Sequence, residues 1–305
     1  MIFFEPIPFK VMLMALFVLF MLVFVNEITR RNKYVSIIFY ILLPIFLTIF
    51  VWPTSASEQS MFAWVKTYSA LAGVICFMYI RYKDGAVKKW VLVLPAVILA
   101  VNILEAIIVD FKSFSVVNEI IDGVTVIGGP WNIINGIAGI ISILTITGWF
   151  GIVISKKKSK DMIWPDLSIY WVVAYSIWNL SYCLNCISDR AFYAAVLPMA
   201  SCLIALLFFR KGAWLQHRAQ TLALWAMTTI TIPAFAATSE FAVKSLNNEP
   251  ALLILSIVSL LANVGVLVFE IYTVRKYKRN IFKDDLYVER KFYKQSLEDN
   301  GLLNV

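Results

Sequence analysis

The chain has 305 residues, of which 61% are hydrophobic and 15% are charged, and its formal net charge is +8. Soluble domains are typically about 45–50% apolar and about 25% charged, so this composition excludes an ordinary soluble protein and indicates an integral membrane protein. The basic residues stand at the ends of apolar stretches, where they would contact anionic lipid headgroups, and this placement argues against a nucleic-acid-binding protein.

The first 25 residues have the apolar core of a signal peptide, but Glu5 precedes that core and no basic region or cleavage site accompanies it. We therefore expect a retained first span. A membrane-spanning helix needs about 20 mostly apolar residues, and about nine segments meet this requirement. The predicted fold is an all-α polytopic bundle of residues 1–274, with spans at about 7–28, 34–52, 61–80, 90–109, 131–154, 166–186, 191–209, 219–238 and 251–274.

Twenty-two of the 27 Lys and Arg residues lie in five clusters, which follow the first, third, fifth, seventh and ninth of these spans. Cytoplasmic loops of membrane proteins retain positive charge, whereas outer loops do not. The clusters therefore predict an N-terminus outside and a C-terminus inside. Arg218 belongs to the fourth cluster in this interpretation, with Arg210 and Lys211, and a basic cytoplasmic tail occupies 275–305.

Two features outside the spans invite a structural prediction. The outer loop 110–130 contains Asp122-Gly123 between apolar and β-branched residues, which is typical of a β-hairpin, although a short interfacial helix remains an alternative. Either would cover the outer face like a lid. The tail 275–305 mixes charged and apolar residues, and we expect it to lie as a helix along the inner surface.

Prolines and glycines predict a packed interior. Four prolines lie inside spans, where a kink is tolerated if neighbouring helices satisfy the freed carbonyls; they are Pro44, Pro95, Pro198 and Pro233. Four glycines give the fifth span thin faces that admit another backbone; they are Gly136, Gly139, Gly148 and Gly151. We expect this helix near the centre of the bundle.

Two ionisable residues lie within the predicted spans and need a partner or a purpose. Lys66 is about five residues inside the outer end of the third span, or roughly 7.5 Å at a helical rise of 1.5 Å per residue. Glu105 lies at a similar depth in the fourth. Adjacent antiparallel helices would bring the two together, so we predict an ion pair. The alternative is that Lys66 extends outward to the interface while Glu105 accepts a hydrogen bond between helices.

Further polar and aromatic residues fall at a similar depth. Asn102 shares a helix face with Glu105, and Asn132 and Asn135 occupy the outer end of the fifth span. In the sixth span Tyr175, Trp178, Tyr182 and Asn185 follow helical spacing, with Asn179 beside them. Such a face suits a cavity for a small polar or cationic molecule, although an aromatic belt with ordinary interhelical hydrogen bonds is an equal alternative. The predicted solute-binding residues are Lys66, Asn102, Glu105, Asn132, Asn135, Tyr175, Asn179 and Tyr182.

On the inner side, the lone histidine His217 is a candidate for proton transfer or gating because its pKa is ordinarily near neutral, although an interfacial role is more common. A single histidine excludes a multi-histidine metal site, and we expect no metal or cofactor. Cys183 and Cys186 form a Cys-x-x-Cys near the end of a span, whereas redox pairs usually open a helix. A redox function is therefore not expected.

The sequence contains the segments Pro130-Trp-Asn-Ile-Ile-Asn-Gly-Ile-Ala-Gly139, Tyr175-Ser-Ile-Trp-Asn-Leu-Ser-Tyr-Cys-Leu-Asn185 with Arg190-Ala-Phe-Tyr193, and Arg210-Lys-Gly-Ala-Trp-Leu-Gln-His-Arg-Ala-Gln-Thr221. These segments resemble those of an uncharacterised family of bacterial multi-pass membrane proteins. The resemblance covers most of the chain. It implies a bacterial inner-membrane location and supplies no mechanism.

Three hypotheses about function follow. The first is a small-solute transporter or channel-like protein whose pocket opens outward, with the lipid bilayer and the solute as its partners. The second is a non-transporting sensor or scaffold, which predicts a solid bundle without a cavity and leaves its protein partner unknown. The third, an intramembrane enzyme, is less favoured because no familiar catalytic motif is present and only Glu105 with Lys66 or Tyr182 could supply the chemistry.

Overall fold

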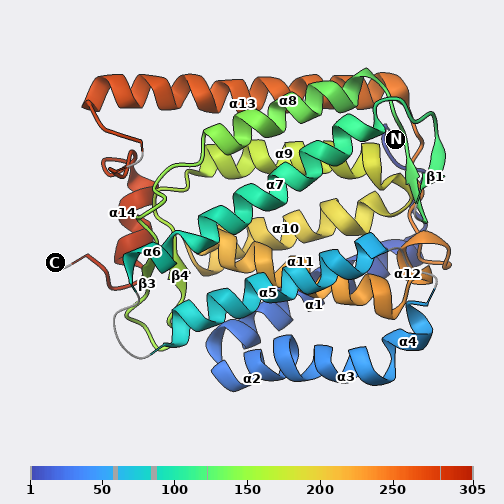
Figure 1. The fold of residues 1–305 in the computed structure, drawn as a ribbon, viewed down its shortest axis with the longest axis horizontal. Helices are drawn as coiled ribbons and strands as arrows, with labels where there is room; N and C mark the ends of the chain where they lie inside the picture. Colours follow the sequence, from blue (N-terminus) through green and yellow to red (C-terminus); the bar gives the residue numbers. More distant parts are fainter. Residues whose placement is uncertain (1, 58–60, 84–87, 122, 282, 304–305) are drawn as a thin grey trace.

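The computed structural model describes residues 2–57, 61–83, 88–121, 123–281 and 283–303. Its helices run back and forth between two ends of the molecule (Figure 1). At one end lies an antiparallel hairpin of β1 (Glu119–Ile121) and β2 (Val124–Val126), which we call the hairpin end. At the other lie the paired strands β3 (Val153–Ile154) and β4 (Met162–Ile163) and the short helix α14 (Lys291–Glu298). We call this the tail end.

Six helical segments are long and apolar enough to cross a membrane, which fits a membrane protein. Three of them are single helices or nearly so: α1 (Phe9–Arg31), α5 (Met61–Tyr82) and α13 (Glu249–Tyr277). The other three are composite, and their parts are α2 (Lys33–Ile37), η1 (Ile38–Leu42) and α3 (Leu43–Phe50); α6 (Lys89–Leu92) and α7 (Leu94–Ser113); and η3 (Phe192–Val196), α10 (Leu197–Ile204) and η4 (Ala205–Phe209).

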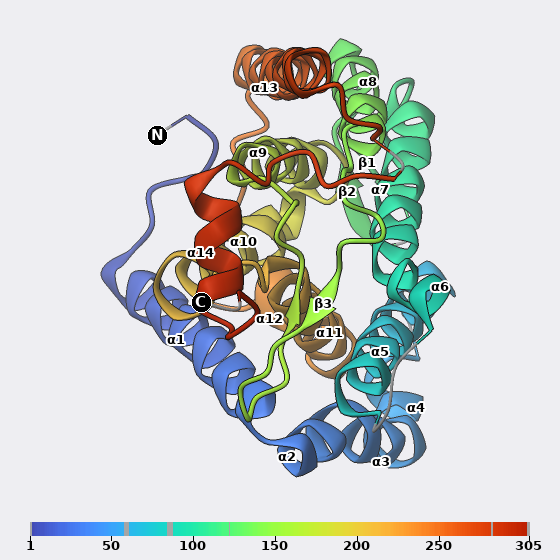
Figure 2. The same cartoon turned by 90° about the vertical axis from the view of Figure 1, so that its left-hand side faces the viewer.

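The remaining three predicted spans also fall on helices, which are α8 (Pro130–Leu144), α9 (Ile169–Cys186) and α11 (Trp214–Thr231). They are shorter or more polar than the six. Viewed end-on, α9, α10 and α11 occupy the middle of the bundle, and α1, α5, α7 and α13 lie around them (Figure 2). Polar side chains on α9 and α11 are thereby kept away from the outer surface, where they would be costly in a membrane. Short helical turns complete the fold: α4 (Trp52–Ser55), η2 (Ser188–Arg190) and α12 (Ala234–Ala237).

Each of the four prolines inside a predicted span lies where one helical segment gives way to another. Pro44 and Pro198 begin the α-helices that follow the π-helical turns η1 and η3, and Pro95 begins α7 after a break at Val93. Pro233 caps α12 after α11 has ended. A proline lacks a backbone donor and cannot continue the ladder of the preceding turn, so the predicted interruptions follow from its chemistry.

The predicted extent of the fifth span is wrong at its C-terminal side, because α8 ends at Leu144 and not near residue 154. Gly148 adopts a left-handed backbone (φ +62°), and a Cβ there would lie 2.4 Å from Cβ of Asp166. Gly148 and Gly151 therefore serve a tight loop and not a helix face. Gly136 and Gly139 do lie on the helix, where a Cβ would meet Phe111 and Ile107 at 2.5 and 2.6 Å, respectively. These two allow the close approach of α7.

The outer loop forms the β1–β2 hairpin, so the hairpin alternative is confirmed and the helix alternative is wrong; Asp122 itself lies outside the described residues. The loop is shorter than predicted, because α7 continues to Ser113. In the tail, the prediction of a helix holds for the last residues of α13 and for α14. Residues 283–290 instead fold against the segment between α8 and α9, where the backbone N–H of Tyr287 donates to Oδ1 of Asp166 at 2.8 Å.

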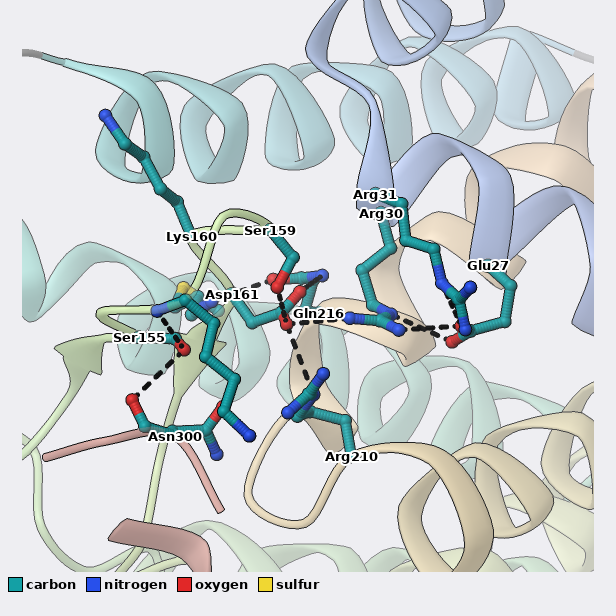
Figure 3. Close-up of polar contacts among 12 residues, drawn as sticks. Glu27, Arg30, Arg31, Ser155, Ser159, Lys160, Asp161, Arg210, Gln216 and Asn300 are labelled. Carbon is teal, nitrogen blue, oxygen red and sulfur yellow. Dashed lines mark hydrogen bonds and ion pairs between the residues drawn. The ribbon is translucent and has the colours of Figure 1, made fainter. Parts of the chain in front are cut away.

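A buried ionic cluster around Asp161 closes the tail end (Figure 3). Asp161 is fully buried, and its carboxylate lies 2.8 Å from Nη1 of Arg30, 3.4 Å from Nε of Arg210 and 3.8 Å from Nη2 of Arg81. Ser159 Oγ and Gln216 Nε2 donate to it at 2.6 and 3.2 Å. Burial alone would raise the pKa of Asp161, but Arg30, Ser159 and Arg81 together hold that pKa below its usual value.

We predict that Asp161→Asn lowers the free energy of unfolding at pH 7 by about 3–5 kcal/mol, because it leaves buried arginines without their counter-charge. The measurement is reversible unfolding of the protein in lipid nanodiscs. As a matched control, Glu240→Gln removes an exposed pair with Lys10 whose side chains are 62% and 60% accessible, and should cost at most about 1 kcal/mol. Equal losses in the two variants would contradict the central role of Asp161.

The same variant should change the pH dependence of stability. A carboxyl whose pKa is lower in the folded state than in the unfolded state stabilises the fold above its unfolded pKa, and the stabilisation is lost as the pH falls through the folded pKa. The difference between wild type and Asp161→Asn should therefore shrink once the pH falls below the usual value of 3.8. A difference in unfolding free energy between the two proteins that stays constant below this pH would show that it does not arise from the charge of Asp161.

Candidate functional site

A cavity of about 460 Å³ lies between α5, α7, α9 and α11. Its wall begins at the hairpin end, with residues of the β1–β2 hairpin such as Val124 and Val126, and continues past Asn102 toward the tail end as far as Leu215. Along α7 alone the lining residues extend from Ile98 to Ser113, which is about 22 Å at 1.5 Å per residue. The cavity therefore extends along much of the length of the bundle and has the size of a small-molecule site.

The contact predicted between Lys66 and Glu105 is present. Lys66 Nζ on α5 donates to Oε2 of Glu105 on α7 at 2.8 Å and to Oδ1 of Asn102 at 3.2 Å. Lys66 and Asn102 line the cavity, whereas Glu105 is not part of the wall. The charge of Glu105 is therefore directed at the lysine and not at the cavity.

The aromatic and amide face predicted on α9 also borders the cavity. Tyr175, Trp178, Asn179 and Tyr182 all line it. The rings form a row, with centroids 5.5 Å apart between Tyr175 and Trp178 and 6.2 Å apart between the stacked rings of Trp178 and Tyr182. Helical spacing is what places these side chains on one face, since residues three and four apart are neighbours on a helix.

Asn132 and Asn135, by contrast, do not line the cavity. Both are fully buried in α8 and donate to the carboxylate of Asp110, at 3.1 and 2.7 Å. Asn135 also accepts a hydrogen bond from Ser259 on α13 at 3.1 Å. The two amides thus link α7, α8 and α13, and they support the wall without forming it.

His217 is also separate from the cavity. It is buried at the tail end, with Nε2 3.9 Å from Oε1 of Glu27. Neither ring nitrogen has a hydrogen-bond partner among the described residues. Its proposed role in proton transfer or gating remains a prediction.

The two cysteines of the Cys-x-x-Cys both line the cavity and are free thiols. Sγ of Cys186 lies 3.4 Å from Oδ1 of Asp110. The pair lies in the last turn of α9, so neither thiol is next to a helix N-terminus that would activate it.

Two functional candidates were not identified from the sequence. Asp110 was assigned to the outer loop, but it is fully buried within α7. Arg218 was assigned to a basic cluster outside the membrane, but α11 begins at Trp214 and Arg218 lines the cavity. Helical spacing in the sequence could have identified Arg218. It falls on one helix face with Leu215, Leu222 and Trp225, and all four residues line the cavity.

These features fit a helical membrane protein with an internal cavity. The chain belongs to a family of unknown function, DUF5692, whose model matches residues 5–299, which confirms the resemblance to an uncharacterised family. No curated protein and no solved structure matches the chain.

A double-mutant cycle on Lys66→Met and Glu105→Gln tests the ion pair. Each single substitution leaves one charge unpaired between helices, whereas the double variant removes both. We expect the double variant to be more stable than the sum of the single effects predicts, by an amount near the lower end of the usual range of about 0.5–3 kcal/mol, since the side chains are 26% and 32% accessible. Additive losses of unfolding free energy would contradict the pairing.

Proposed function

We propose that this protein is a multi-pass transporter of a small solute in a bacterial inner membrane, with nine spans, the N-terminus and hairpin end outside, and the tail end inside. The observation on which this proposal depends is the cavity of about 460 Å³. A scaffold or sensor without a ligand requires no such space, and a close-packed helix bundle normally leaves few voids larger than a water molecule.

The position and lining of the cavity support transport. It lies between α5, α7, α9 and α11 and is also lined by residues of the β1–β2 hairpin, which would act as its lid. Its wall combines apolar surface with a few polar side chains, which include Lys66, Asn102 and Asn179. This combination is typical of small-molecule sites, where polar groups fix orientation and apolar surface supplies most of the contact.

An intramembrane enzyme is less well supported. The only acid available for such chemistry in the sequence-based hypothesis was Glu105, which pairs with Lys66 and does not line the cavity. The orientation across the membrane is supported by the clusters of Lys and Arg at the tail end, including Lys156, Lys157 and Lys158 in the loop between β3 and β4.

Cysteine accessibility from both sides tests transport against one-sided binding. We place Asn179→Cys in a variant whose four native cysteines are replaced by serine, and apply the impermeant anionic thiol reagent MTSES to right-side-out and inside-out vesicles. A transporter exposes its site alternately to each side, so we expect labelling in both preparations. Val268→Cys, on the exposed outer face of α13, is the control and should not react from either side.

Labelling of Asn179→Cys from one side only would indicate a receptor or sensor instead of a transporter. Absence of labelling from both sides would contradict a solute pathway through this cavity.

A further inference from the structure

The charge of the cavity wall is of one sign. Four basic side chains line it, and no Asp or Glu is among the described residues of the wall; the four are Lys66, Lys112, Arg190 and Arg218. A cation of this wall that has no neighbouring counter-charge gives the cavity a positive potential, which attracts anions and repels cations.

Three of these four cations are neutralised or near the surface. Lys66 pairs with Glu105 at 2.8 Å, and Arg190 pairs with Asp189 at 2.9 Å. Lys112 is exposed at the hairpin end of α7. None of these three requires a ligand to compensate its charge.

Arg218 is different. It is only 8% exposed, and no carboxylate of a described residue lies within ion-pair distance of it. Its one hydrogen bond in the described part of the chain is from Nε to the hydroxyl of Tyr175 at 3.4 Å, and its guanidinium lies 6.0 Å from the centre of the Tyr175 ring. The remaining N–H groups of the guanidinium have no partner there.

A buried cation without a counter-charge is costly in a membrane helix, and such residues usually mark a functional site. Because Arg218 lines the cavity, a bound anion could supply the missing charge. The planar guanidinium presents parallel N–H donors that match a carboxylate or a phosphate.

The surroundings of Arg218 favour a particular kind of anion. The aromatic row begins with Tyr175 beside Arg218 and continues through Trp178 to Tyr182. Phe77 and Leu99 add apolar surface to the same cavity. A ligand bound through Arg218 therefore extends along rings and aliphatic side chains, where an apolar body gains contact area and a highly hydrated inorganic ion gains nothing.

We propose that the cavity binds an organic acid with an apolar body, whose carboxylate pairs with Arg218 and whose body lies along Tyr175, Trp178 and Tyr182. This inference rests on the proposed solute-binding function and replaces the expectation of a polar or cationic solute. It makes Arg218 the residue that selects the charge of the ligand.

The test compares three probes that share one body, using calorimetric titration of the purified protein in nanodiscs. 3-Phenylpropionate carries the carboxylate, 3-phenylpropionamide is its uncharged analogue, and phenethylammonium has the opposite charge. We expect saturable binding of the carboxylate, with affinity for the other two weaker by about 10-fold or more. Inorganic phosphate, the fourth probe, should bind more weakly than the carboxylate because it lacks the apolar body.

Substitutions of Arg218 test the residue itself. Arg218→Gln should weaken binding of 3-phenylpropionate by about 10-fold or more, and Arg218→Lys should lie between this variant and wild type because it keeps the charge but loses the fork. Arg275→Gln, which removes an exposed arginine of α13 that does not line the cavity, should leave binding unchanged.

Stability separates a ligand-binding role from a structural one. If the charge of Arg218 is compensated only by a bound ligand, this charge destabilises the ligand-free protein. Arg218→Gln should therefore raise the melting temperature in the absence of ligand. An arginine that holds the fold together would lower it on substitution.

The inference would be overturned if the amide or the amine bound as tightly as the carboxylate, if Arg218→Gln left carboxylate binding unchanged, or if none of the probes bound at several millimolar. Tighter binding of inorganic phosphate than of 3-phenylpropionate would equally overturn it. The labelling of Asn179→Cys is independent of these outcomes, so a transporter of a different solute would still be recognised.

Discussion

The tail end of the bundle depends on one buried carboxylate. Asp161 lies in the turn between β3 and β4, and it contacts Arg30 at the end of α1, Arg81 at the end of α5 and Gln216 in the first turn of α11. These segments are far apart in sequence, so their ends are fixed relative to one another by a shared charge. Since α5 and α11 form two walls of the cavity, this cluster also fixes the shape of the cavity at that end.

The first turns of α11 contain two buried polar side chains in contrasting environments. Gln216 bonds to Asp161 and belongs to a cluster in which each arginine faces an acid. Arg218, two residues later, faces the cavity and no acid among the described residues. A low-dielectric interior makes the first arrangement strong and the second costly. The contrast is the physical reason for assigning Asp161 to the fold and Arg218 to a ligand.

Hydropathy was enough to predict a bundle of apolar helices. Helical spacing and depth in the spans predicted the pairing of Lys66 with Glu105 and the shared face of Tyr175, Asn179 and Tyr182. Hydropathy failed where polar residues continue a helix beyond its apolar stretch, because a polar helical turn and a polar loop have the same composition. Arg218 and Asp110 were misplaced for this reason. The early end of α8 was missed because Gly148 and Gly151, which were assigned to a helix face, belong to a tight loop packed close to Asp166 and Asp285, and spacing along the chain does not reveal such packing.

Whether the cavity holds an organic anion at Arg218 can be seen in a structure of the protein with 3-(4-bromophenyl)propionate. We expect density for the carboxylate at the guanidinium of Arg218 and an anomalous bromine peak beside the aromatic row, toward Tyr182. A ligand in the reverse orientation, or a bromine peak outside the cavity, would contradict it.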